Sequence, residues 1–177
     1  MDVQQYLADI SGVDADGLLD EWRWLLGDHR VSVFRATAMG DLILKDDAGQ
    51  FHLLDMIDGV VRHLADSEPE LWAVLTDRRT RKTLLSTFVV RGLRNAGVVL
   101  GRFQCYSPDL PPILGGSLSR ENLTACDLTF HASVLGQIHR QVKNLPPGTR
   151  IGEIKFVGPD AEQSAAPDPG RKAGPGR

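Results

Sequence analysis

The spacing of apolar residues changes from a helical to a strand period early in the chain. Between residues 15 and 26 apolar side chains recur every three or four positions, which predicts a helix with Asp14 as N-cap and Gly27 at its end. Residues 2–9 are predicted to form a shorter helix. From residue 31 the period falls to two, and turn residues interrupt it at 39–41, 46–49 and 57–59. Strands are therefore predicted at 31–37, 42–44, 51–55 and 60–64, and such short turns make them an antiparallel β-meander.

The helical period returns after the meander. Ser67 and Glu70 outline a capping box, which predicts a short helix that ends at Leu75. Residues 107–117 contain three prolines and two glycines and are expected to form an ordered or partly ordered loop. The remaining predicted elements are a long helix at 79–95, a strand at 98–106, an extended piece near 123, a helix at 127–143 and an edge strand at 151–157. This order predicts an α+β fold in which an antiparallel sheet packs against helices.

Composition changes at the C-terminal end. Residues 157–177 offer almost nothing to bury and carry proline or glycine at close intervals, so we expect a disordered tail after a single domain at 1–156. Met1 is followed by Asp2 and a polar stretch, which predicts no signal peptide. No window approaches about 18 apolar residues, so no membrane span is predicted and we expect a cytoplasmic protein. Two cysteines without a second pair predict neither a zinc knuckle nor a disulfide framework.

Charge is distributed unevenly along the chain. Residues 1–77 contain 16 Asp and Glu against 5 Lys and Arg, whereas residues 78–177 contain 7 against 15. Either the two halves attract each other inside the fold, or an acidic face is available for a basic partner. The overall charge of −3 is unlike that of a protein that binds nucleic acid directly.

Few residues are candidates for chemistry. The five histidines include no pair at i,i+4 spacing and no metal-binding signature, and His131 and His139 are interpreted as surface or capping residues. Phosphate-binding loops and a nucleophile elbow are absent from the sequence. The meander carboxylates are interpreted as turn formers, with a patch for a cationic partner and an acid–base or metal site as alternatives. We therefore expect no catalytic residue, no metal and no cofactor.

Three segments together resemble a known family. They are residues 33–44, residues 100–116, and residues 121–137. In this order and at these intervals they resemble the C-terminal domain of type VI secretion DNase-effector immunity proteins, a former domain of unknown function, over residues 31–151. The motif residues are Thr37, Gly40, Tyr106, Gly115, Gly116 and Gln137. The resemblance implies a cytoplasmic antitoxin that binds and neutralises a cognate protein toxin and has no enzymatic activity of its own.

Two alternatives remain beside the immunity protein: an adaptor or regulatory binding module of the same fold, and a metal-dependent hydrolase that uses the meander aspartates. A nucleic-acid-cleaving toxin needs a cationic cleft, and carboxylates can compete for it. The predicted contact surface is therefore the acidic edge of the meander together with the loop 108–116. Its candidate residues are Asp41, Asp46, Asp47, Asp55, Asp58, Leu110, Pro111 and Pro112. Gly40 and Gly116 are expected to adopt positive φ in turns.

Overall fold

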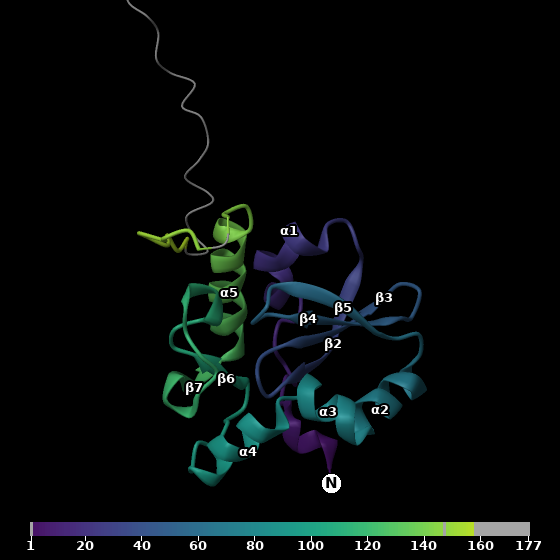
Figure 1. Ribbon diagram of the computed structural model, residues 1–177. Coiled ribbons are helices and arrows are strands. Elements are labelled where there is room, and N and C mark those ends of the chain that lie inside the picture. Colours follow the sequence, from purple (N-terminus) through teal and green to yellow (C-terminus); the bar gives the residue numbers. More distant parts are fainter. Residues whose placement is uncertain (1, 147, 158–177) are drawn as a thin grey trace, which may run out of the picture.

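An antiparallel sheet of five strands, in the order β1-β2-β3-β4-β5, forms the centre of the computed structural model, which describes residues 2–146 and 148–157 (Figure 1). The predicted meander and the α+β class are confirmed. The strands are β1 (Leu7–Ala8), β2 (Val31–Thr37), β3 (Leu42–Asp46), β4 (Phe51–Asp55) and β5 (Val60–Ala65). β1 was not predicted: residues 2–9 form a 3-10 turn, Val3–Tyr6, and then pair with β2, so the helix expected there is wrong.

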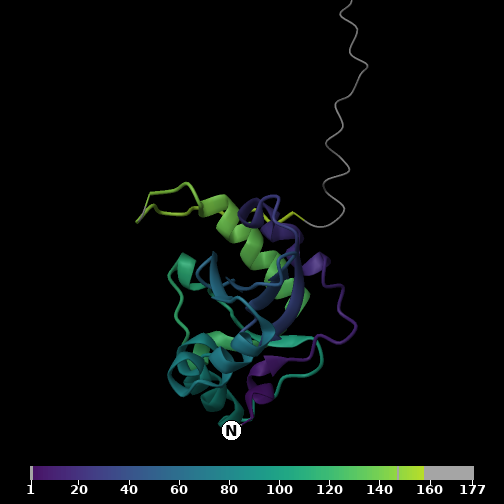
Figure 2. The same cartoon turned by 90° about the vertical axis from the view of Figure 1, so that its right-hand side faces the viewer.

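Helices cover the sheet on both faces. Figures 1 and 2 show α2 (Glu68–Thr76), α3 (Arg78–Leu84) and α4 (Thr87–Asn95) together below the sheet, whereas α5 (Leu128–Val142) stands beside it. A second, two-stranded sheet pairs β6 (Gln104–Pro108) with β7 (Leu123–Asp127). Short 3-10 turns lie between these strands at Pro112–Leu114 (η3) and Arg120–Asn122 (η4). No helix in the described part of the chain is long and apolar enough to cross a membrane.

Two apolar clusters lie on opposite faces of the sheet because neighbouring strand residues point to opposite sides. Ile43 belongs to the cluster under α2–α4, whereas Leu42 and Leu44 belong to the cluster under α5. The second cluster also holds Trp22, which donates its indole N–H to the carbonyl of Ala132 at 2.9 Å. Trp22 comes from the predicted helix 15–26, which is instead a 3-10 helix, Gly17–Trp22 (η2), followed by one α turn, Arg23–Leu26 (α1).

The predicted helix 79–95 is wrong as one element. It is divided at Ser86, whose φ of 43° lies in the left-handed region. The break lets Leu85, before it, and Val90 and Leu93, after it, enter the same core cluster. As a consequence Phe88, at the start of α4, is 80% exposed.

Three smaller predictions are also corrected. The strand expected at 98–106 begins only at Gln104, because Phe103 has a φ of 61°. Ser67 is the N-cap of α2 but makes no side-chain cap bond, and Glu70 instead accepts from the N–H of Asp66 at 2.9 Å. Residues 151–157 form no strand. Of the predicted tail 157–177, all but Val157 lies outside the described residues.

Candidate functional site

The five candidate aspartates do not share one edge of the meander. Asp46 ends β3 and Asp47 follows it in the hairpin to β4, whereas Asp55 ends β4 at the other end of the sheet. Asp41 and Asp58 lie with Asp55 at that end, near α5, as the register between β3 and β4 requires. The structure thus divides the predicted acidic edge into two groups on opposite sides of the domain.

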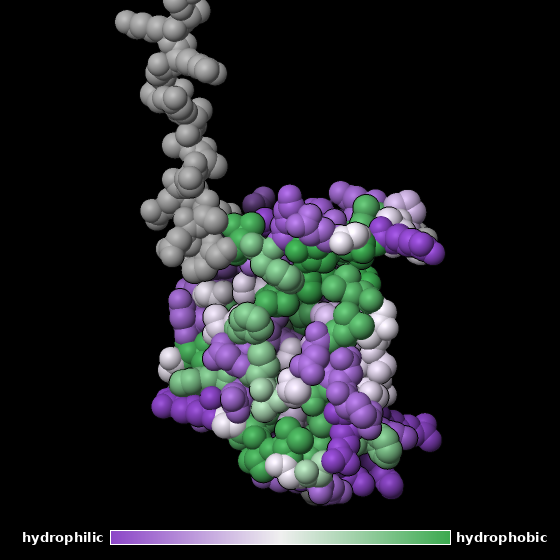
Figure 3. All heavy atoms as spheres, turned by 90° about the vertical axis from the view of Figure 1, so that its left-hand side faces the viewer, coloured by the Kyte–Doolittle hydropathy of each residue, from purple (hydrophilic) through white to green (hydrophobic). Residues whose placement is uncertain are grey.

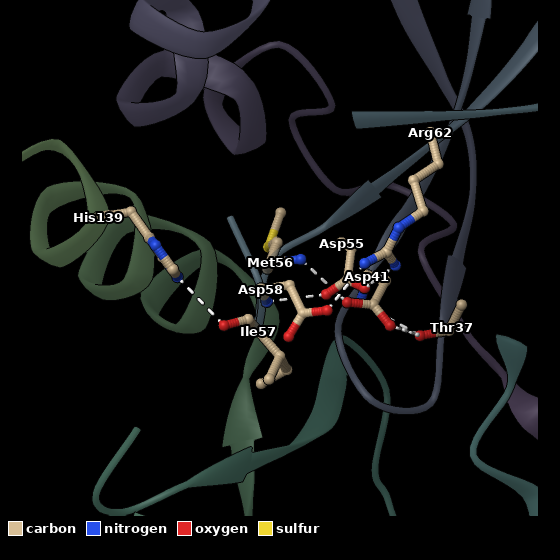
Figure 4. Close-up of polar contacts among 8 residues, drawn as sticks. All are labelled: Thr37, Asp41, Asp55, Met56, Ile57, Asp58, Arg62 and His139. Carbon is tan, nitrogen blue, oxygen red and sulfur yellow. Dashed lines mark hydrogen bonds and ion pairs between the residues drawn. The ribbon is translucent and has the colours of Figure 1, made fainter. Parts of the chain in front are cut away.

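Asp41 is buried, so the prediction that its side chain reaches solvent is wrong. Its Oδ1 accepts the backbone N–H of Met56 at 3.0 Å, and Thr37 Oγ1 lies 3.4 Å from its Oδ2 (Figure 4). The Thr37 hydroxyl also accepts the N–H groups of Met39 at 3.2 Å and Asp41 at 3.1 Å, which closes the β2–β3 turn. Burial raises the pKa of Asp41 to about 7, and the nearby carboxylate of Asp55 adds to this rise.

Three of the other four candidate aspartates, Asp46, Asp55 and Asp58, have partners. Arg62 forms ion pairs with both Asp55 and Asp58 (Figure 4). Asp46 accepts the N–H of Gln50 at 2.8 Å and lies 2.9 Å from His52 Nε2, and these hydrogen bonds lower its pKa. Asp46 and Asp55 are turn formers, since Asp55 likewise accepts the backbone N–H of Asp58 at 2.9 Å.

α5 packs against the same end of the sheet through two histidines. His131 lies against Gly40, where a Cβ atom would overlap its ring, and His139 lies in the same way against Gly59. His131 Nδ1 is 2.8 Å from Ser107 Oγ, and His139 donates to the Ile57 carbonyl at 3.2 Å (Figure 4). Burial lowers the pKa of His131 to about 4. Both side chains are buried packing groups, so the predicted surface position is wrong.

An apolar groove runs between α5 and the loop that follows β6. Its volume is about 670 Å³, and Figure 3 shows the face of the molecule that carries it, where apolar side chains reach the surface. Of the three predicted contact residues in the loop, Leu110 and Pro111 line the groove. The third, Pro112, begins η3 beside it. Phe130 and Val134 of α5 and the side chain of Phe156 complete its apolar wall. We call this feature the α5 groove.

The loop beside the groove is held in one shape by Asn122, which lies in the third family-like segment but is not among the candidate site residues. Its amide accepts the N–H of Leu110 at 2.9 Å and donates to the carbonyls of Leu110 and Ser117, each at 2.7 Å. Gly115 has a φ of 96°. Gly116 has no positive φ, contrary to the prediction; a Cβ there would overlap the Leu110 carbonyl, so close approach requires this glycine.

The remaining motif residues connect this loop to the sheet and to α5. Tyr106 donates its backbone N–H to Ala38 and its hydroxyl to Val98, both at 2.8 Å. Gln137 is buried on α5, and its side-chain amide contacts the backbone of Val157. Among residues 2–146 and 148–157, no group of three or more His, Cys, Asp and Glu side chains is placed to hold a metal ion.

Comparison with known proteins supports the resemblance. Residues 66–139 match the family described as T6SS immunity protein Tdi1, C-terminal, which confirms the resemblance over α2 to α5. The first motif, residues 33–44, lies outside this match. No curated protein matches the chain. A similar solved structure is the crystal structure of Atu4351 from Agrobacterium tumefaciens, with 17% identity over 70% of this chain and a TM-score of 0.48. This chain covers 64% of that one, and so distant a likeness supports no functional argument.

Proposed function

We propose that this protein is a cytoplasmic immunity protein that binds a cognate toxin at the α5 groove and neutralises it by occlusion, without catalysis of its own. The immunity role is supported by the family match over residues 66–139. The groove lies almost entirely within that match, from Ser107 on β6 to Ile138 on α5. The overlap between the residues of the groove and the residues of the family match is the observation that carries the proposal.

The chemistry of the groove suits a protein partner. Leu110 is 47% exposed, Phe130 63% and Phe156 56%, and they gather around one concave feature. Exposed apolar side chains that are scattered singly need no explanation, but a contiguous apolar patch marks an interaction site. Because Asn122 fixes the adjacent loop before any partner arrives, little ordering entropy is lost on binding.

The toxin is proposed to cleave nucleic acid. Residues 1–77 carry 16 acidic against 5 basic side chains, which creates a negative field suited to a cationic active-site cleft. Since Asp46 and Asp47 lie on the side of the domain away from α5, they are assigned to long-range attraction of the toxin. Contact itself is assigned to the groove.

The test is a pair of matched substitutions at exposed phenylalanines. Phe130 lines the groove, whereas Phe88 is on α4 and outside it. Phe130→Ala is expected to raise the dissociation rate from the toxin at least ~10-fold, because a buried aromatic anchor contributes more than 1.4 kcal/mol to an interface. Phe88→Ala should leave the rate unchanged. Surface-plasmon kinetics with the cognate toxin measures both dissociation rates. Equal effects of the two substitutions, or no binding of the toxin by either variant, would reject the proposal.

A further inference from the structure

Two glutamines on α5 hold an extended segment of chain by its backbone alone. Gln137 donates to the carbonyl of Val157 at 3.0 Å and accepts the N–H of the same residue at 2.8 Å. Gln141 does the same with Lys155, donating at 2.8 Å and accepting at 3.1 Å. Each side-chain amide therefore pairs with one residue as a neighbouring β-strand would, through one N–H and one C=O.

Both amides are oriented by α5 itself. The Nε2 of Gln137 also donates to Ser133 Oγ, one turn earlier, at 3.2 Å. The Nε2 of Gln141 donates to the carbonyl of Gln137, also at 3.2 Å. One N–H of each amide is thus fixed on the helix, and the second N–H and the Oε1 face outward. The pair is preorganised, which reduces the entropy lost when a segment binds.

The spacing of the two glutamines matches the repeat of an extended chain. Residues four apart on a helix are separated by about 6 Å along its axis. Alternate residues of a strand are separated by roughly 6.6 Å. Gln137 and Gln141 can therefore engage residues i and i+2 of a segment that runs antiparallel to α5, as Val157 and Lys155 do. Because only backbone groups are engaged, any residue except proline can occupy the two positions.

Residues 155–157 themselves bury little side-chain surface, whereas Ile154, just before them, packs against the cluster under α5. Lys155, Phe156 and Val157 are all exposed although they lie against the helix. Phe156 and Val157 both line the α5 groove, but they remain 56% and 42% exposed. An occupant that is held by four backbone hydrogen bonds and two largely exposed apolar side chains is suited to displacement.

We propose that Gln137 and Gln141 form a binding site for an extended peptide segment of a partner protein, and that residues 155–157 occupy it in the free protein as a displaceable strap. A partner segment would pair with the two amides and place a larger apolar side chain in the α5 groove. The identification of this partner with the toxin rests on the function proposed above; the peptide site does not.

The first experiment opens the site in the full chain. Lys155→Pro with Val157→Pro removes both N–H donors of the strap, whereas the control, Lys155→Ala with Val157→Ala, keeps them. The probe is a blocked peptide of residues 152–157, titrated while the side-chain amide resonances of Gln137 and Gln141 are followed by NMR. Binding should be at least ~10-fold tighter to the proline variant than to the control, because a tethered segment competes at an effective concentration near millimolar.

If the site recognises only backbone groups, the same titration should also distinguish peptides that are N-methylated at different residues. N-methylation of the peptide at the lysine or valine should abolish binding, whereas N-methylation at the phenylalanine should preserve it. Adding Gln137→Ala to the proline variant should also abolish binding. Peptide affinity that is equal in the proline and alanine variants, or indifferent to Gln137→Ala, overturns the site.

The last experiment measures the affinity of the toxin for the proline variant and for the alanine control. If a toxin segment uses this site, the proline variant should bind toxin several-fold tighter than the alanine variant, because the competing strap is gone. Equal toxin affinity with intact peptide binding would overturn the assignment of the toxin as the partner of this site. Failure of every variant to bind toxin would instead reject the proposed function, and the peptide titration would still decide whether the site exists.

Discussion

The imidazole of His131 lies where a side chain at Gly40 would be. Gly40 has a φ of 94°, and a Cβ on it would overlap the Nε2 edge of the ring. Nδ1 of the same ring is held 2.8 Å from Ser107 Oγ, while Nε2 has no hydrogen-bond partner among the described residues. This contact joins the β2–β3 turn, β6 and α5, and so positions the wall of the groove relative to the sheet.

Gly40→Ala should destabilise the protein far more than Gly49→Ala. Both glycines have positive φ, 94° and 84°, so alanine incurs a backbone cost of about 1 kcal/mol at either site. Only at Gly40 does the new methyl also collide with a buried ring, since nothing lies near a Cβ at Gly49. Urea unfolding should show a loss of roughly 1 kcal/mol for Gly49→Ala and at least twice that for Gly40→Ala. Similar losses in the free energy of unfolding of the two variants would mean that backbone strain alone explains the requirement for glycine at position 40.

Asp41→Asn should stabilise the protein at neutral and alkaline pH. The folded pKa of Asp41, about 7, lies above its ordinary value of 3.8, so ionisation opposes folding. The stability provided by the neutral carboxyl is fully present below about pH 4 and is lost as pH rises through 7. Asparagine keeps an acceptor for the Met56 N–H and cannot ionise.

The free energy of unfolding of the two chains, compared from pH 4 to 8, measures this effect. The advantage of asparagine should be absent near pH 4 and reach up to roughly 4 kcal/mol above pH 7. His131 acts in the opposite direction, since its lowered pKa makes protonation oppose folding as pH falls from about 6.5 to 4, but its effect cancels in the comparison. An advantage that does not vary with pH would show that Asp41 is not the titrating group.

Deletion of residues 158–177 should leave the free energy of unfolding within ~0.5 kcal/mol of the full chain, because the segment offers almost no apolar surface to bury. Thermal unfolding of both chains is the measurement. A decrease of several degrees in melting temperature would show that the segment stabilises the domain.

A charge change at the β3–β4 hairpin should slow toxin association but not change dissociation. Asp47→Lys reverses an exposed charge, and Asp46→Asn removes one while keeping an acceptor for the Gln50 N–H. Charges outside a contact act on the rate of encounter and its salt dependence. Kinetics at two salt concentrations measures this, and a faster dissociation would place the hairpin inside the interface.

The meander could be predicted because short apolar strands lie between clusters of turn residues, as Phe51–Asp55 lies between the turns at 46–49 and 57–59. The break at Ser86 could not, since the apolar spacing of Leu84, Leu85 and Val89 continues across it without interruption. Burial of Asp41 depends on Met56 and on packing far along the chain, which local sequence does not report. Residues 151–157 were expected to be extended as a strand; their backbone partners are glutamine side chains instead.

Of the predicted contact residues, Leu110 and Pro111 lie at the groove and the aspartates do not. The three prolines and two glycines of residues 107–117 predicted that loop from the sequence. Asn122 lies in the third segment that resembles the family, but its role in fixing the loop through three hydrogen bonds could not be predicted, because such an asparagine resembles any surface asparagine.

Hydrogen–deuterium exchange of the full chain, with and without the toxin, tests the location of the interface most directly. Backbone amides that are covered by a partner exchange more slowly. The account predicts slower exchange in residues 107–116 and along the exposed side of α5, with no change in the β3–β4 hairpin or in α3 and α4. Protection confined to α3 and α4, or to the hairpin at Asp46 and Asp47, would contradict it.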